Sequence, residues 1–278
     1  MKWRWPALIV GIPASLLLFV IFVIILIPTA EIEKVVAGAI ERAGYTYRAA
    51  EFGKALPIGI KARNLEIAAE RGLLLRADSA VVRLRLLPLF AGKVSFSYRA
   101  GIGKGEIRGD FSPFSGGAAH AEISHLRLED IPFFTPTGAR IKGDLQAQGR
   151  FSGKGNSANG EAQLEAKNVE LAEVKIGGMP LPDASYDNVR GALKVSMGKA
   201  VLESFTLQGE GLYVRLKGDF PVIAPLGAAP LNLTLELMPK PDFLEKQKFV
   251  FLLLAKYLTS PGAYQIPIRG TLAKPAIQ

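Results

Sequence analysis

Two histidines are the residues of this sequence whose side chains could most readily bind a metal ion or act as a base. His120 and His125 are the only histidines of the chain, and they lie five positions apart in a segment that alternates like a strand. That spacing predicts side chains on opposite faces of the strand. Imidazoles on opposite faces do not share a metal ion, so we predict solvated or hydrogen-bonded roles for both.

The glycine-rich segment and the serines offer no catalytic motif. Residues 101–105 read G-I-G-K-G, which matches neither a Walker loop nor a dinucleotide fingerprint, and a turn is the better interpretation. A nucleophilic serine of the hydrolase type would need a G-x-S-x-G context. That context is missing around Ser157, Ser196 and Ser204.

The amino-acid composition excludes further kinds of catalytic and metal site. The 278 residues include no cysteine, which excludes a thiol nucleophile, a thiolate metal site and a disulfide. Glu161 and Glu165 share a predicted strand face with Gln163 and Lys167, where solvation explains them. We therefore predict that the protein is not an enzyme and has no catalytic residues, no metal site and no cofactor.

The formal net charge of +9 indicates anionic surroundings such as lipid head groups or nucleic acid. The basic residues are dispersed through strand-like segments and form no long run. A nucleic-acid site would usually combine a clustered basic patch with stacking aromatic residues. We therefore predict no nucleic-acid partner.

The elements that must position any site are strands. Residues 140–151, R-I-K-G-D-L-Q-A-Q-G-R-F, alternate polar with apolar or small residues, which predicts a half-buried antiparallel strand. Its core, apolar-basic-Gly-x-apolar, recurs from Ile107, Val189, Leu216 and Ile268 at irregular spacing. One copy indicates no more than an amphipathic strand of an all-β domain. Five copies predict a long curved sheet with one continuous apolar face.

That apolar face is the candidate binding site. A sheet of many strands does not leave such a face in water, so closure of the sheet on itself, a late helix or bound lipid must cover it. A glycine on this face lets another backbone come close or lets the strand coil. The residues that we expect to line a possible apolar groove are Ile107, Phe111, Ile141, Leu145, Phe151, Val189, Leu193, Leu216, Leu233, Leu235 and Phe251.

The N-terminal residues predict a membrane anchor. Residues 7–27 carry no charge, and a helix of that length crosses about 30 Å of hydrocarbon. A cleaved signal peptide is the alternative, but its apolar region is typically about 7 to 15 residues long. Lys2 and Arg4 precede the span and Glu31 and Glu33 follow it, which places the N-terminus in the cytoplasm. In a bacterium this predicts a single-pass inner-membrane protein whose body lies in the periplasm.

The predicted domains are a cytoplasmic N-terminus (1–6), a transmembrane helix (7–27), a linker helix (28–44) and a periplasmic β domain (45–278). In the linker helix, Thr29 is the expected cap, Gly44 the expected end, and the apolar stripe comprises Ile32, Val35, Val36, Ala39 and Ile40. Residues 177–187 are expected to form an irregular crossing. The expected strands are 56–67, 73–86, 93–99, 107–111, 119–128, 140–151, 161–167, 189–197, 201–208, 212–219, 231–237 and 266–272.

One segment departs from the strand pattern. Residues 243–258 lack alternation, and Asp242 with Glu245 resembles a capping box, so we predict a late helix containing the apolar run 249–255. That run is too short to span a membrane. The predicted fold class is therefore mainly β: the transmembrane helix, a short amphipathic helix, then a long antiparallel meander forming a curved open groove or barrel-like sheet, with one late apolar helix.

The order of these features resembles the type II secretion system protein N family. The resemblance rests on the anchor, the short helix, residues 73–89 (L-L-L-R-A-D-S-A-V-V-R-L-R-L-L-P-L), the I-K-G-D-L-type strands, the late helix and the closing P-I-R-G-T-L-A-K-P. The strands are also similar to those of AsmA-like and lipopolysaccharide-transport bridge proteins, whose open β-grooves carry acyl chains. The family resemblance implies an inner-membrane component of an envelope machine that exports folded proteins, and it supplies no catalytic motif.

Two functions stay open at this point. As a non-catalytic component of a type II secretion system, the domain would bind other secretion-system subunits through its edge strands or wet face. As a lipid-binding or lipid-transfer groove between envelope membranes, it would hold acyl chains on its dry face. In both cases the anchor would contact inner-membrane lipids. The discriminating feature is whether a second layer covers the dry face.

Overall fold

The computed structural model describes residues 26–69, 72–114, 116–132, 138–153, 155–176, 178–223 and 226–278. The predicted membrane span, residues 7–27, lies outside the described residues except for Leu26 and Ile27. No helix in the described ranges has the length and the apolar character needed to cross a membrane. The description that follows therefore concerns the linker helix and the β domain.

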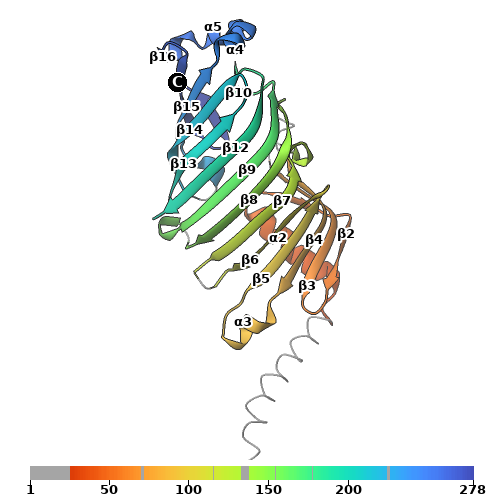
Figure 1. Cartoon of the computed structure of the whole chain (residues 1–278). Helices are drawn as coiled ribbons and strands as arrows, with labels where there is room; N and C mark the ends of the chain where they lie inside the picture. Colours follow the sequence, from red (N-terminus) through yellow and green to blue (C-terminus); the bar gives the residue numbers. More distant parts are fainter. Residues whose placement is uncertain are drawn as a thin grey trace, which may run out of the picture.

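One antiparallel sheet dominates the described part of the chain, and sixteen strands form it in nearly sequential order (Figure 1). The mainly β, open and curved antiparallel sheet is thus confirmed. Strands β10 (Lys175–Ile176) and β11 (Met179–Pro180) make a separate hairpin. The strands of the large sheet are β1 (Thr46–Arg48), β2 (Glu51–Ala55), β3 (Gly59–Ala69), β4 (Gly72–Leu84), β5 (Phe96–Ile102), β6 (Gly105–Ser112), β7 (Ala118–Arg127), β8 (Arg140–Ser152), β9 (Asn159–Ala172), β12 (Ala184–Ser196), β13 (Lys199–Gln208), β14 (Leu212–Pro221), β15 (Asn232–Pro239), β16 (Leu258–Ser260), β17 (Ala263–Thr271) and β18 (Lys274–Ile277).

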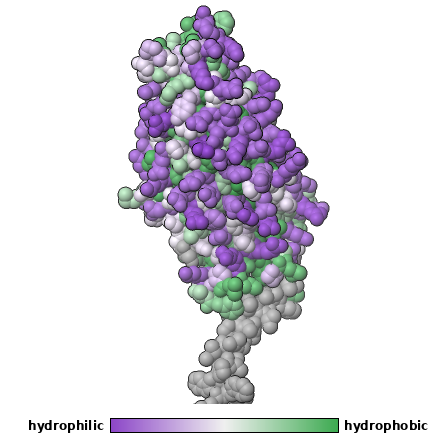
Figure 2. All heavy atoms as spheres, viewed as in Figure 1, coloured by the Kyte–Doolittle hydropathy of each residue, from purple (hydrophilic) through white to green (hydrophobic). Residues whose placement is uncertain are grey.

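Alternation of side chains gives this sheet two unlike faces. In β8 the polar residues of the alternating sequence are exposed, whereas Ile141, Leu145 and Ala147 are half-buried. Figure 2 shows the face turned to the viewer covered largely by hydrophilic residues, and Figure 1 shows helix α2 (Thr29–Arg42) on the far side. The side chains of the far face gather into two apolar clusters that draw on many strands. The sheet therefore has one largely apolar face and one largely polar face.

The strand register joins the apolar side chains into rows. One such row, which we call the central row, takes one residue from each of twelve described strands. Each of its residues is the direct pairing partner of the next residue on the neighbouring strand. Cross-strand neighbours on one face stand close enough to pack against each other. The row comprises Ala62, Ala80, Ala100, Ile107, Ile123, Ala147, Leu164, Gly191, Phe205, Leu216, Leu235 and Ile266.

Bulges in the central strands interrupt strict alternation. The register between β7 and β8 shifts between Ile123 and Leu126, and His125 there has a φ of 52°. Gly143, at the register shift of β8, has a φ of 141°, which favours glycine. Such bulges bend a strand and increase its twist, which helps the sheet to curve. His125 lies at the bulge of β7 and is exposed, so the regular strand alternation from which we predicted opposite faces for the two histidines is interrupted between them.

The linker helix is present, with different details from those expected. Helix α2 ends before Gly44, whose φ of 87° suits the residue after a helix. Its N-cap is Pro28 and has no side-chain capping bond to a described residue, so Thr29 is not the cap. Val35, which we expected on the apolar stripe, is 69% exposed. The helix contacts β1 and β2.

The late helix was predicted as one element, and that prediction is wrong. The structure has α4 (Pro241–Lys246), α5 (Lys248–Leu253) and the 3₁₀ turn η5 (Ala255–Tyr257). The helix breaks at Gln247, where φ is −109° and ψ is 25°. Lys240, not Asp242, is the N-cap of α4, and no side-chain capping bond forms among the described residues. Packing explains the break, because the kink lets the buried Phe251 lie 6.2 Å from Phe243, centroid to centroid.

Other boundaries also differ from the sequence interpretation. The glycine-rich residues 101–105 contain the turn between β5 and β6. The turn itself is only two residues long, Gly103 and Lys104, because β5 ends at Ile102 and β6 begins at Gly105. The crossing at residues 177–187 contains β11 and the start of β12. The expected strand 73–86 ends earlier, and the L-L-P-L-F sequence forms helix α3 (Leu86–Phe90). The remaining short turns are η1 (Leu128–Asp130), η3 (Gly155–Ser157) and η4 (Leu226–Ala228).

Candidate functional site

The apolar face is fully covered at its C-terminal end. Leu254 and Ile266 there have no exposed surface, and Leu237 is 2% exposed. The ring of Phe251, from α5, lies 5.1 Å from the ring of Tyr264 in β17 and packs into the same cluster. Met179 and Leu181, from the β10–β11 hairpin and the segment after it, pack against this cluster as well. This end of the face is a closed hydrophobic core.

The middle of the apolar face is covered less completely. The second, smaller cluster of buried residues lies there and comprises Ala77, Ile102 and Leu126. Ile107 and Ile123 pack against it but are themselves half-buried, as are Leu145, Ala147 and Leu164. Apolar side chains that keep part of their surface exposed over several neighbouring strands form a surface that can contact a further apolar molecule. We call the half-buried residues Ile107, Ile123, Leu145, Ala147 and Leu164 the open apolar face.

All eleven residues predicted for the apolar groove lie on or against this one face of the sheet, as the pairing register shows. The extent to which these eleven side chains are buried differs along the sheet. Val189, Leu233, Leu235 and Phe251 belong to the closed core, and Phe151 at one end of β8 is 36% exposed. The half-buried ones are Ile107, Phe111, Ile141, Leu145, Leu193 and Leu216. The structure therefore divides the predicted residues between a closed core and the more open part of the face.

Two glycines of the recurring phrase make room for aromatic rings on this face. A Cβ at Gly191 would lie 2.8 Å from a ring carbon of Phe205. A Cβ at Gly109 would lie 2.0 Å from the carbonyl oxygen of His120 and 2.6 Å from the Tyr98 hydroxyl. That hydroxyl donates a hydrogen bond of 3.0 Å to the same carbonyl oxygen, and burial together with Asp110 raises the pKa of Tyr98. The glycines thus shape the face without adding polar groups to it.

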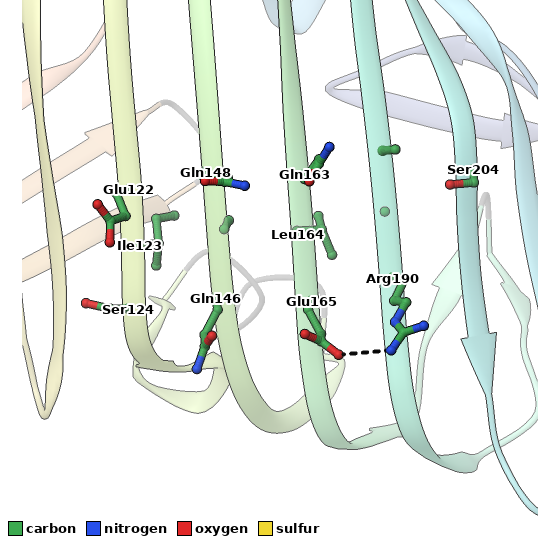
Figure 3. A pocket seen from close by; sticks show the side chains of 13 residues that line it. Glu122, Ile123, Ser124, Gln146, Gln148, Gln163, Leu164, Glu165, Arg190 and Ser204 are labelled. Carbon is green, nitrogen blue, oxygen red and sulfur yellow. Dashed lines mark hydrogen bonds and ion pairs between the residues drawn. The ribbon is translucent and has the colours of Figure 1, made fainter.

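The opposite, polar face has a shallow depression of about 540 Å³ in its centre (Figure 3). Arg190 and Glu165 form an ion pair of 3.5 Å across two neighbouring strands. A similar pair joins Arg108 to Glu122 at 2.7 Å, and its hydrogen bond lowers the pKa of Glu122. The remaining polar side chains of the lining are Ser124, Gln146, Gln148, Gln163 and Ser204. The depression offers hydrogen bonds and paired charges, and the sequence analysis did not identify it.

The described residues contain no group of three or more His, Asp or Glu side chains arranged to hold a metal ion. The Nδ1 atom of His120 lies 3.8 Å from Asp110, and both side chains belong to the polar face. A bound molecule on either face would therefore meet the chemistry of that face: an apolar surface on one side, and solvated amides and ion pairs on the other.

Three residues of the open apolar face, Ile123, Ala147 and Leu164, are not among the eleven residues predicted for the groove. Ile123 and Leu164 lie in strands that were correctly expected, but their place in the central row depends on long-range pairing. Alternation within each strand could have assigned them to the apolar face. Comparison of the chain with protein-family models, curated proteins and solved structures found no significant match.

Proposed function

We propose that this protein is a non-catalytic lipid-binding component of the bacterial envelope, in which the open apolar face holds acyl chains. The observation that carries the proposal is a continuous apolar row across twelve described strands that is closed at its C-terminal end and only half-buried in its middle. A closed core would need no ligand. A half-covered face of this extent gains stability from an apolar ligand.

The chemistry of the face fits a hydrocarbon chain. Ile107, Ile123 and Leu164 present aliphatic surface, and the neighbouring Ala147 leaves room beside them. Each methylene group that leaves water contributes about 0.8 kcal/mol, so a chain that buries only part of its length would bind measurably. The charged side chains of these strands lie on the other face, where they form cross-strand pairs such as Arg108–Glu122. The face would therefore bind ligands with longer hydrocarbon chains more tightly.

The N-terminal residues supply the cellular context of the proposal. An uncleaved span at residues 7–27 would hold the protein in the inner membrane, with the N-terminus in the cytoplasm and the β domain in the periplasm. The domain would then have access to inner-membrane lipids. The similarity of the strands to lipid-carrying β-groove proteins points in the same direction.

The proposal is tested by a pair of substitutions at neighbouring positions on opposite faces. Leu145→Asp places a carboxylate on the open apolar face, whereas Gln146→Asp places one on the exposed polar face. We expect Leu145→Asp to lower the amount of lipid that co-purifies with the full chain by about tenfold, because burying a carboxylate against an acyl chain costs more than the 1.4 kcal/mol that corresponds to a factor of ten. Mass spectrometry of extracted lipid gives the ratio.

The Gln146→Asp variant is the matched control for lipid around the anchor. It is expected to keep the lipid content of the unchanged protein, and both variants are expected to keep the circular dichroism of a β protein. Equal lipid content in both folded variants would contradict the proposal.

A second candidate function is a subunit of a type II secretion system that acts by binding proteins in the periplasm. The polar depression favours it, because the ion pair of Arg190 and Glu165 and the surrounding glutamines offer specific contacts to a protein surface. The resemblance of the motif order to the protein N family also supports it. A photo-crosslinking residue in place of Gln163 is expected to capture a secretion-system subunit in cells. Capture of no protein at this position would count against this candidate.

A further inference from the structure

The segment formed by α4, α5 and η5 has two apolar sides, although only one of them is needed for folding. On the inner side, Phe251, Leu254 and Tyr257 are at most 7% exposed and pack into the closed core. On the outer side, Phe249 is 85% exposed and Leu252 is 69% exposed. A short helix that is apolar all round needs a second apolar contact beyond the core.

Four lysines lie in this segment or directly before it. Lys240, Lys246, Lys248 and Lys256 are all exposed, and none of them takes part in an ion pair with another residue of the described ranges. Elsewhere on the sheet, several cationic side chains, such as Arg108, Arg190 and Lys217, are paired with carboxylates across strands. The Nζ of Lys256 lies 4.6 Å above the ring of Tyr257, which places its charge next to the apolar residues. Asp242 and Glu245 are the acidic residues of α4.

This segment lies at one end of the molecule, where its outer side is accessible to a large surface such as a membrane. Figure 1 shows α4 and α5 at one end of the molecule and α3 at the other. Leu253 and Leu258, which are 59% and 50% exposed, widen the apolar area at this end. The site lies outside the open apolar face of the middle strands.

We propose that the outer side of α5 docks onto a lipid bilayer that carries anionic head groups. Exposed Phe and Leu side chains bordered by lysines are typical of elements that lie in a membrane interface, where the apolar groups enter the acyl boundary and the lysines contact phosphates. A protein partner fits less well, because lysine is depleted in the centres of protein interfaces. The surface is independent of acyl-chain binding in the middle of the sheet, so either proposal can fail alone.

The absence of cysteine makes a direct test simple. Single substitutions Phe249→Cys and Leu252→Cys in the full chain can each carry an environment-sensitive fluorophore, with Met197→Cys as the control. Met197 is 79% exposed in the turn between β12 and β13. The labelled proteins are held in nanodiscs and mixed with vesicles of phosphatidylcholine and phosphatidylglycerol whose acyl chains are brominated.

We expect blue-shifted emission and bromine quenching at positions 249 and 252, no change at position 197, and no effect with vesicles of phosphatidylcholine alone. The double variant Lys246→Glu, Lys248→Glu is expected to weaken vesicle binding at least about tenfold, because each lysine contributes to attraction by an anionic surface. Quenching at positions 249 and 252 no greater than at 197 would overturn the proposal. A blue shift without quenching would also overturn it, since the label would then contact something other than the anionic vesicles.

Discussion

Replacing Ile266 by aspartate is expected to abolish folding of the β domain. Ile266 has no exposed surface, and it is paired with Leu235 in the closed C-terminal part of the central row. An isolated carboxylate in such a place costs several kcal/mol, which approaches the whole stability of about 5 to 15 kcal/mol of an ordinary domain. Loss of the β-type circular dichroism signal and rapid proteolysis of the purified protein would report the unfolding.

The neighbouring residue provides the control for this substitution. Gln265 is exposed on the other face of β17, so Gln265→Asp is expected to leave the domain folded. Leu145→Asp, in the half-buried middle of the sheet, is expected to fold as well. If Ile266→Asp folded as stably as Gln265→Asp, the assignment of this end of the face as a closed core would be wrong.

Shortening Leu254 to alanine is expected to lower the free energy of unfolding by about 2 to 5 kcal/mol. Leu254 follows α5, has no exposed surface, and packs in the same cluster as Phe251 and Tyr257. Truncation would leave a cavity at the place where the late helical segment covers the sheet. Chemical denaturation followed by circular dichroism measures the change.

Leu252→Ala is the matched control, because the same truncation two residues earlier removes a side chain that is 69% exposed. We expect a change within about 0.5 kcal/mol. Equal destabilisation by both substitutions would mean that α5 does not pack with one defined side against the core. The same Leu252→Ala variant is expected to bind anionic vesicles less well, because we propose that the exposed Leu252 side chain contacts the bilayer.

The fold class could be predicted from the sequence because alternation is a local property. Strand β8 keeps the predicted separation of Ile141 and Leu145 from the polar residues between them. The glycines of the recurring phrase were correctly expected on the apolar face, and Gly191 is indeed approached closely by Phe205. These features depend only on the period of a strand and on the size of a side chain.

Other features depend on contacts that no local pattern contains. The bulge at His125 shifts the register of β7, and the break at Gln247 follows from packing Phe251 against Phe243 and Tyr264. The polar depression was not predicted either, because Arg190 and Glu165 form their ion pair only when β9 and β12 are paired. Whether the apolar face is covered is a property of the whole sheet, so the sequence left that question open.

Site-specific photo-crosslinking in cells tests the central proposal most directly. A photo-crosslinking residue at position 164 would lie on the open apolar face, and the same residue at position 163 would lie on the polar face of the same strand. Acyl-chain binding predicts lipid adducts, identified by mass spectrometry of the purified full chain, at position 164 and not at position 163. Lipid adducts at neither position, or equally at both, would contradict the proposal that the apolar face holds acyl chains.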